Sequence, residues 1–337
     1  MALEYADSFD AYNTSQITRR YPTAAAITIN TPGVGGVGTY LAVNSTGGGG
    51  FSPNSLAFLI TVRSEYYIGF DLSCSGIPQT FLTIDTAASG NICTFGILSN
   101  GAISSSFGNS SSGIITAGTW YQVQIYLKRH ATAGIVTVKV DGVMVINLTN
   151  QNTGATDIGI IVLQTLGVLS SHYDNLWIFN TLGTHSNTWP TGRIKVQPLL
   201  PSTDGTYTDW IPNSGSDHYS RVSEAQADDD TTYNSTIMSG NKDSYEIGAL
   251  SGSPAQIHGV IVTAIARKTD VNSKNYQVFS KSGATETYSS DIAAALTYAS
   301  STANGAAALL HTDDPNTSAQ WTQANLNAIE IGAKVTL

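Results

Sequence analysis

The strongest structural signal in the sequence is the stretch Gly134-Ile135-Val136-Thr137-Val138-Lys139-Val140-Asp141-Gly142-Val143-Met144-Val145-Ile146-Asn147. Apolar and polar residues alternate before Asp141, and both faces of the segment after Gly142 are apolar. The Asp-Gly pair supplies the positive backbone dihedrals that a two-residue type I′ turn requires, so the stretch predicts a β-hairpin. Residues 120–127, 158–163 and 173–179 also have strand patterns. We therefore expect an antiparallel sheet built around residues 120–180.

The rest of the first half has the same organisation. Turn signals recur about every ten residues, which is typical of an antiparallel sandwich. Residues 8–12 form a short opening segment, and strands are expected at 26–30, 39–43, 56–62, 66–72, 81–85 and 92–98. Gly33, Gly35 and Gly38 have the spacing G-x-G-x-x-G. A strand pattern follows them instead of a helix, so they do not predict a dinucleotide site.

Three motifs in this half resemble those of a known fold. They are Trp120-Tyr121 at the start of a strand, the turn Val140-Asp141-Gly142-Val143, and the strand Tyr173-Asp174-Asn175-Leu176-Trp177-Ile178-Phe179-Asn180. Over residues 5–182 the chain resembles the laminin G-like, concanavalin A-like jelly roll. That fold serves lectins, glycan hydrolases, adhesion modules and viral coat parts, so the resemblance implies a fold and no single function.

The second half predicts another β-rich domain. A length of 337 residues suits two domains of ~100 to 200 residues each. Residues 183–200 form a polar, proline-interrupted linker, and 204–246 are acidic and irregular with short strands at most. Strands are expected at 257–267, 276–280, 286–292 and 331–337, and Thr322 could cap a helical turn. We predict an all-β protein with a jelly-roll domain at 1–182 and a smaller β-sandwich at 201–337.

A second resemblance covers this half. Its residues are Gly192-Arg193-Ile194-Lys195-Val196, Pro198, Asp209-Trp210, Val222, Glu224, Asp228 to Tyr233, Pro315 to Thr322 and Leu326 to Gly332. In this order they are similar to the C-terminal part of virion structural proteins of tailed bacteriophages, where that part also follows a laminin G-like domain. The resemblance implies a non-enzymatic particle component located in the virion. We expect a capsid decoration or cement protein; the alternative is a tail or fibre-associated adhesin that binds a host-surface glycan.

The amino-acid composition limits the classes of molecule that the protein is expected to bind. Only 12% of residues are charged and the net charge is −9, which argues against binding to nucleic acid. No apolar run approaches the ~20 residues that cross a membrane, and the N-terminus lacks the pattern of a secretory signal. We expect the chain to be made in the host cytoplasm. Its expected partners are further copies of itself, as a homotrimer, and other virion proteins, above all the major capsid protein.

Candidate catalytic carboxylates are sparse. Glycan hydrolases on this fold place two carboxylates on one face of one strand. Asp71 and Asp85 come nearest, but each is alone on its strand, so we expect no enzyme. The pair Asp217-His218 invites a catalytic interpretation, yet no G-x-S-x-G nucleophile motif accompanies it, and a surface hydrogen bond is favoured.

Metal ligands are equally sparse, and no cofactor is expected. The candidate calcium ligands are Asp174 and Asn175 in the closing strand, and Asp228 and Asp230 in an acidic run that lacks the glycine and distal glutamate of an EF-hand loop. A solvated acidic loop is the simpler interpretation of that run. The six histidines have no pair at metal-ligand spacing.

The sequence alone does not define the residues of a glycan-binding site. Trp189, Trp210 and Trp321 could stack on sugars, but tryptophans near prolines usually pin loops to a core. The Gly- and Ser-rich loops 44–50 and 107–113 are candidate contact loops. Cys74 and Cys93 could form one disulfide, although two buried free thiols suit a chain without a disulfide-rich pattern better.

Overall fold

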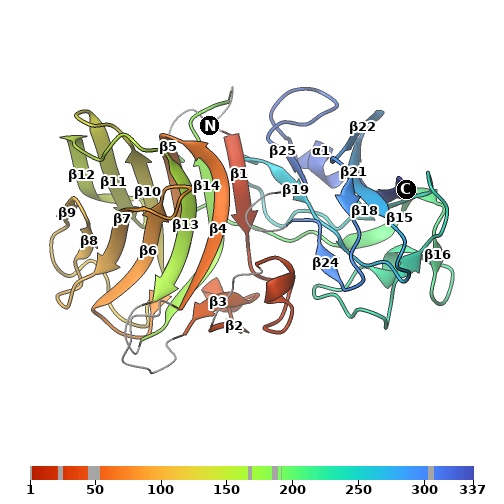
Figure 1. Ribbon diagram of the computed structural model, residues 1–337, viewed down its shortest axis with the longest axis horizontal. Coiled ribbons are helices and arrows are strands. Elements are labelled where there is room, and N and C mark those ends of the chain that lie inside the picture. The colour runs from red at the N-terminus through yellow and green to blue at the C-terminus, as the bar shows by residue number, and fades with distance from the viewer. Residues whose placement is uncertain are drawn as a thin grey trace. The chain divides into compact units, whose positions relative to one another are not determined.

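The computed structural model describes residues 2–21, 26–44, 54–165, 169–183, 189–190, 192–302 and 307–337. These residues form strands β1 to β26, three short 3-10 helices and one short α-helix, so the all-β prediction is confirmed. The chain divides into two compact units (Figure 1). The first ends at Val196 and the second begins at Gln197.

Unit 1 is a jelly-roll sandwich of two antiparallel sheets (Figure 1). The order of the first, sheet A, is β12 (Val143–Gln151), β11 (Gly134–Val140), β10 (Tyr121–Lys128), β5 (Glu65–Cys74), β14 (Ser171–Asn180), β3 (Tyr40–Val43) and β2 (Ile27–Asn30), with β1 (Ala2–Asp7) also on β14. The order of the second, sheet B, is β4 (Asn54–Arg63), β13 (Ile158–Thr165), β6 (Gln79–Asp85), β7 (Asn91–Ile97), β8 (Ile103–Ser105) and β9 (Gly108–Asn109).

The hairpin that the sequence predicts forms the β11–β12 edge of sheet A. Val140 pairs with Val143 across the turn, and Asp141 and Gly142 have φ angles of 47° and 82°. Both values lie in the left-handed region that a type I′ turn needs. Alternation then sends Val136, Val138 and Val140 inward to the core, where all three are buried. The predicted hairpin and its two-residue turn are confirmed.

The core of unit 1 lies between the two sheets. It is one apolar cluster to which sheet A contributes residues such as Phe70 and Ile125, and sheet B residues such as Phe81 and Ile161. Each such side chain removed from water contributes roughly 1.5 to 3 kcal/mol. Because the inner face of sheet A supplies this core, the side chains that alternate with it point to the other, outer face.

The beginning of the chain differs from the expectation. The opening strand is β1, and the predicted segment 8–12 turns away from the sheet because Phe9 has a φ of 60°. The Phe9 amide donates to the Asp7 carboxylate at 2.8 Å. Asp7 also forms an ion pair with Arg20 at 3.0 Å, next to the 3-10 helix η1 (Ile17–Arg19). Such a buried, multiply bonded carboxylate can hold an uncommon backbone conformation.

Unit 2 is built around sheet C. Its order is β15 (Pro201–Thr208), β18 (Lys242–Ile247), β26 (Glu330–Val335), β21 (Asn275–Ser282) and β22 (Thr285–Tyr288), with β23 (Ile292–Ala293) also on β21. Three two-stranded ribbons complete it: β16 (Ile211–Pro212) with β17 (Asn234–Ser235), β19 (Val260–Val262) with β25 (Leu309–His311), and β20 (Ile265–Ala266) with β24 (Ala299–Ser300). The remaining helices are η3 (Tyr219–Arg221) here and η2 (Val34–Gly36) in unit 1.

Several predictions for unit 2 need correction, and two are confirmed. The predicted strand 257–267 is two strands, β19 and β20, because its halves pair with different partners. The segment 286–292 is likewise divided between β22 and β23, and the acidic stretch 204–246 begins and ends in the regular strands β15 and β18. Strand β26 is paired on both sides, as expected for the closing segment. Thr322 caps α1 (Gln323–Asn327) by accepting a hydrogen bond from the Asn325 amide at 3.1 Å.

Candidate functional site

The outer face of sheet A carries a row of polar and aromatic side chains. On β10, Gln122, Gln124 and Tyr126 alternate with the core residues. On the neighbouring β5, Tyr67, Gly69 and Asp71 stand opposite Tyr126, Gln124 and Gln122 in the strand register. Amides, a carboxylate and phenol groups are unusual on a buried face of a sheet, because a buried polar group costs free energy unless it is hydrogen-bonded. This composition indicates that the face has a role other than core packing.

A segment that follows β14 lies across this face. It consists of Trp189, Pro190 and residues 192–196, and we call it the strap. The Trp189 indole packs on Tyr67 and Tyr126, with ring centroids 5.1 Å and 6.1 Å apart, and the Lys139 ammonium lies 4.4 Å from the centre of the indole. Trp189 is therefore held by rings and a cation of the sheet.

Two chains of hydrogen bonds join the strap to the sheet. In the first, Trp189 Nε1 donates to Gln124 Oε1 at 2.7 Å, Gln124 Nε2 donates to Gln122 Oε1 at 3.3 Å, and Gln122 Nε2 donates to the carbonyl of Ile194 at 3.4 Å. This chain begins and ends on the strap. It satisfies two glutamine side chains that are almost completely buried.

The second chain centres on Asp71, which is fully buried. Arg193 donates to its Oδ1 at 2.6 Å, and Asn175 Nδ2 donates to its Oδ2 at 2.8 Å. The Val196 amide in turn donates to Asn175 Oδ1 at 2.9 Å. Burial raises the pKa of the Asp71 carboxyl, and the hydrogen bond from Arg193 opposes that rise.

A β-bulge in β14 makes this contact possible. The register of β14 with β5 shifts between Asp174 and Trp177, and Asn175 has a φ of 49°. The bulge turns the Asn175 side chain toward Asp71, and it lays the Trp177 ring over Gly69, where an added Cβ would be 2.1 Å from the ring. Bulges commonly redirect side chains at functional positions.

Asp174 faces the glycine-rich loop that contains η2. Its Oδ2 accepts the Val34 amide at 2.9 Å and its Oδ1 accepts the Asn175 amide at 2.6 Å. Burial raises the pKa of the Asp174 carboxyl to about 7, and Asp10 and Asp71 add to the rise. Gly33 and Gly38 allow a close approach to Asp174 and Asp10, and the strand β3 follows them, as the sequence predicts.

The candidate calcium ligands of unit 1 are thus engaged with protein groups. Asp174 accepts two backbone amides, and Asn175 bridges Asp71 and Val196. In unit 2, Asp228 accepts the amide and hydroxyl of Thr232, and Asp230 pairs with Arg267 at 2.5 Å. The hydrogen bond from Arg267 lowers the pKa of Asp230. Across the described residues, no group of three His, Cys, Asp or Glu side chains has metal-binding geometry.

Three aromatic side chains form a partly exposed cluster at the end of the same face, which we call the aromatic strip. It consists of Tyr40, Trp120 and His172. The Tyr40 centroid lies 5.5 Å from that of Trp120 and 4.9 Å from that of His172, and Trp120 and His172 are 6.4 Å apart. Burial lowers the pKa of His172, so its ring is neutral at pH 7.

Amide and hydroxyl groups border the strip. His172 pairs through Ala42 with Thr28 in the strand register, so the three share one face. Asn44 Nδ2 donates to the Thr28 hydroxyl at 2.8 Å, and the Ser170 hydroxyl donates to Asn44 Oδ1 at 3.2 Å. Partly exposed rings with a few fixed polar groups are the usual composition of a small-ligand site.

The carboxylates that came nearest to a catalytic pair are not brought together. Asp71 belongs to β5 in sheet A and Asp85 to β6 in sheet B, so the sheets separate them. Burial raises the pKa of both carboxyls. The geometry therefore provides no acid and nucleophile on one face from these two residues.

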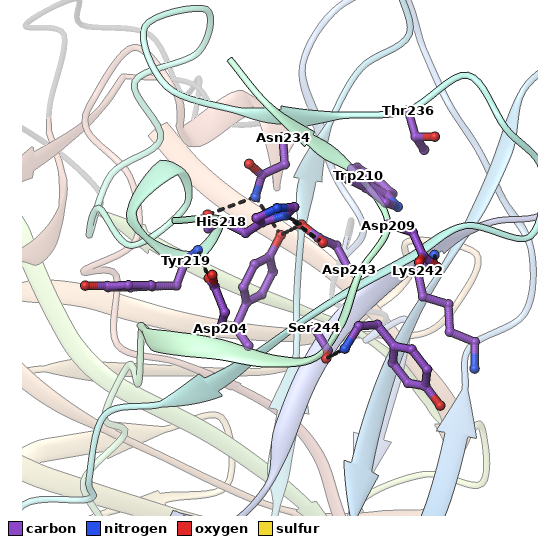
Figure 2. Close-up of polar contacts among 12 residues, drawn as sticks. Asp204, Asp209, Trp210, His218, Tyr219, Asn234, Thr236, Lys242, Asp243 and Ser244 are labelled. Atoms are coloured by element: carbon purple, nitrogen blue, oxygen red, sulfur yellow. Dashed lines mark hydrogen bonds and ion pairs between the residues drawn. The ribbon is translucent and has the colours of Figure 1, made fainter. Parts of the chain in front are cut away.

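Unit 2 contains a buried His–Asp pair, shown in Figure 2. His218 lies next to η3, and its Nδ1 is 2.9 Å from Asp243 Oδ1. The Tyr245 hydroxyl donates to Asp243 Oδ2 at 2.7 Å, and Asn234 Nδ2 donates to the His218 carbonyl at 2.9 Å. The expected surface hydrogen bond of Asp217-His218 is wrong, because His218 is buried and its partner is Asp243 on β18. This cluster ties η3 and the β16–β17 ribbon to sheet C.

The other single-residue predictions have mixed outcomes. Trp189 fastens the strap to sheet A, Trp321 is buried, and Trp210 Nε1 donates to the Asn241 carbonyl, in agreement with the simpler interpretation that these tryptophans pin loops. Cys74 and Cys93 are free and buried, one in each sheet, and burial raises their thiol pKa values to about 12 and about 11. Loop residues 45–50 lie outside the described residues, and 107–113 include the β8–β9 turn of sheet B.

The sequence did not reveal the aromatic strip. The sequence pattern places Trp120 at the start of a strand, which it adjoins, and indicates no role for Tyr40 and His172. The one available signal was that three aromatic residues stand at strand ends, separated by 80 and 52 positions. Only the strand order of sheet A shows that those ends are neighbours.

Comparisons with known proteins concern the fold. No family model and no curated protein matches the chain. Solved structures similar to it include a sialidase (15% identity, TM-score 0.40, 54% of this chain), a pentraxin from Limulus polyphemus (16%, 0.33, 41%) and the carbohydrate recognition domain of Emp47p (11%, 0.31, 53%). The chain spans 19% of that sialidase, 73% of the pentraxin and 97% of the Emp47p domain. Alginate lyases are also similar, at 10% and 14% identity. At these TM-scores none of them carries an argument about function.

Among the described residues, no helix has the length and apolarity to cross a bilayer.

Proposed function

We propose that the protein is a non-catalytic glycan-binding protein and that the aromatic strip of unit 1 is where the sugar binds. The observation that carries the proposal is the contact of three partly exposed rings, Tyr40, Trp120 and His172, beside the bonded Thr28 and Asn44 groups. The apolar face of a pyranose ring stacks on such rings, while neighbouring amides and hydroxyls bind its hydroxyl groups. A neutral His172 ring at pH 7 suits stacking.

The charges near the strip favour a neutral sugar. The guanidinium of Arg193, which lies on the same face, is paired with the Asp71 carboxylate. The whole chain has a net charge of −9, which repels polyanions at long range. We therefore expect a neutral glycan on the host surface, bound without a chemical step.

A glycan array with purified protein tests this proposal. Trp120→Ala and His172→Ala are expected to lower the affinity for the best-bound glycan by at least about tenfold each, since a stacked ring contributes roughly 1.5 kcal/mol. The matched control is Tyr233→Ala, which removes a partly exposed aromatic ring in unit 2. An array without signal for the unaltered protein, or equal binding by all four proteins, would refute the assignment.

A second function rests on a different observation. The virion role expected from the motifs of residues 192–332 remains a prediction, and unit 2 exposes Ile211, Ile237, Met238 and Leu337, each more than half accessible to solvent. Exposed apolar side chains of this kind suit contacts with other proteins. On this hypothesis the protein is a virion component, a homotrimer that cements or decorates the capsid through the major capsid protein, and the glycan site belongs to its outward surface.

Light scattering and co-sedimentation test the second function. We expect a trimer mass in solution, and pelleting with capsids that lack the protein. Binding to purified tails but not to capsids would overturn the cementing role and place the protein as a tail or fibre adhesin. A monomer that pellets with neither would remove the virion assignment and leave the glycan proposal standing.

A further inference from the structure

The interface between the strap and sheet A is chemically unlike the other face of the same sheet. The inner face presents apolar residues such as Phe70 and Val123 to the core. The outer face meets the strap through Gln122, Gln124 and Asp71, which are polar. Separating an apolar core exposes hydrocarbon to water, whereas separated amides and carboxylates regain hydrogen bonds with water or with a ligand.

The covered surface has the same chemical composition as the aromatic strip. Under the strap lie the rings of Tyr67 and Tyr126, stacked with centroids 4.4 Å apart. Next to them are the amides of Gln122 and Gln124, in the row of the sheet that adjoins Trp120. Aromatic rings and polar side chains therefore extend from the open strip into the part of the face that the strap covers.

The strap itself meets the sheet in the way that a bound sugar chain would. The Trp189 ring lies against two phenol rings and its polar edge donates to Gln124. A strap carbonyl accepts from Gln122, and a strap guanidinium donates to Asp71. A sugar chain can make the same contacts with these sheet groups, because its ring faces stack on aromatic rings and its hydroxyl groups both donate and accept hydrogen bonds.

We propose that the strap covers further sugar-binding subsites of the same face, and that a long glycan gains access to them when the strap lifts. This inference rests on the proposed function of the aromatic strip. The open strip then binds one or two sugar units at all times. Longer chains extend over Tyr67, Tyr126 and the two glutamines, with their hydroxyls replacing the hydrogen bonds of the strap.

Because only molecules with a lifted strap can bind a long glycan over the covered subsites, the apparent affinity for long glycans equals the intrinsic affinity multiplied by the fraction of lifted molecules. Arg193 makes the charge-assisted contact that holds the strap, and its side chain is 48% exposed, so its loss weakens the strap and leaves the core intact. Trp189→Ala removes the indole ring that packs on Tyr67 and Tyr126. The double variant Arg193→Ala/Trp189→Ala is therefore the release variant.

The first test uses an array on which each polysaccharide repeat is printed as a disaccharide and as a hexasaccharide. The release variant is expected to bind the hexasaccharide about tenfold more tightly than the unaltered protein and the disaccharide equally well. Protection of Cys74 and Cys93 from a thiol reagent verifies that unit 1 is folded. Equal gains on both lengths, or none on the hexasaccharide, would overturn the proposal.

The second test needs no glycan and separates the two proposals. In hydrogen exchange of the unaltered protein, the Val196 amide is expected to exchange at least about tenfold faster than amides of β5 and β14, because the strap lifts without unfolding the sheet. Exchange of Val196 only together with those strands would refute the strap proposal even if the strip binds sugar. Independent exchange with an empty array would instead refute sugar binding and leave a mobile strap without a ligand.

Discussion

The pH dependence of unit 1 offers a quantitative test of its outer face, through Asp174→Asn. The pKa of Asp174 is about 7 in the folded protein, against about 3.9 in an unfolded chain. The folded state therefore binds this proton more tightly. The resulting stability is fully present below about pH 4 and is lost as the pH rises through about 7. From pH 5 to pH 8 the loss amounts to roughly 2 to 3 kcal/mol.

The variant should flatten this dependence. Asparagine has no proton to release, so the Asp174 share of the loss disappears, although one of the two amide contacts from Val34 and Asn175 is weakened at every pH. The expected result is a free energy of unfolding that changes by roughly 2 to 3 kcal/mol less between pH 5 and pH 8 than in the unaltered protein.

The two cysteines make the assay specific for unit 1. Both lie in that unit and both are buried. A short pulse of a dipyridyl disulfide reagent at each urea concentration labels them only in molecules whose unit 1 has unfolded, at pH 5 as well as at pH 8. If Asp174→Asn and the unaltered protein show the same change between the two pH values, the carboxyl is not held in the buried state that the structure describes.

Three further substitutions probe other contacts. His218→Ala leaves Asp243 buried without its histidine and should lower the stability of unit 2 by roughly 1 to 3 kcal/mol, measured as faster amide exchange in β18; an unchanged rate would show that the pair contributes nothing. Gly69→Ala places a methyl group 2.1 Å from the Trp177 ring and should cost unit 1 more than about 3 kcal/mol by the thiol assay, whereas normal stability would mean that the bulge moves freely. Thr322→Ala removes the cap of α1 and should cost about 1 kcal/mol in urea unfolding of unit 2, with Thr322→Ser retaining most of it.

Local chemistry accounts for the parts of the fold that the sequence predicts well. The β11–β12 hairpin follows from Asp141-Gly142, because two adjacent residues must adopt positive φ. The α1 cap follows from Thr322, whose hydroxyl reaches the Asn325 amide three residues later. These features need only a few consecutive residues, so no knowledge of distant partners is required.

Predictions failed where pairing partners decide the outcome. Residues 257–267 have one continuous strand pattern, yet β19 and β20 pair with strands from different parts of the chain. The sequence suggests Asp217 as the partner of His218, but the actual partner, Asp243, lies 25 residues away on sheet C. A period-two pattern specifies which side chains share a face but not which strand lies next to it.

By itself the sequence determined an all-β protein, its main hairpin, the alternation that fills the core of unit 1 and the low charge that disfavours nucleic acid. Strand order alone decided that Tyr40, Trp120 and His172 meet, and the bulge at Asn175 decided that the strap could be bonded over Asp71. The physical reason is the range of the forces involved. Turn and cap preferences act over a few residues, whereas the outer face of sheet A exists only after strands far apart in the sequence, such as β14 and β3, have paired.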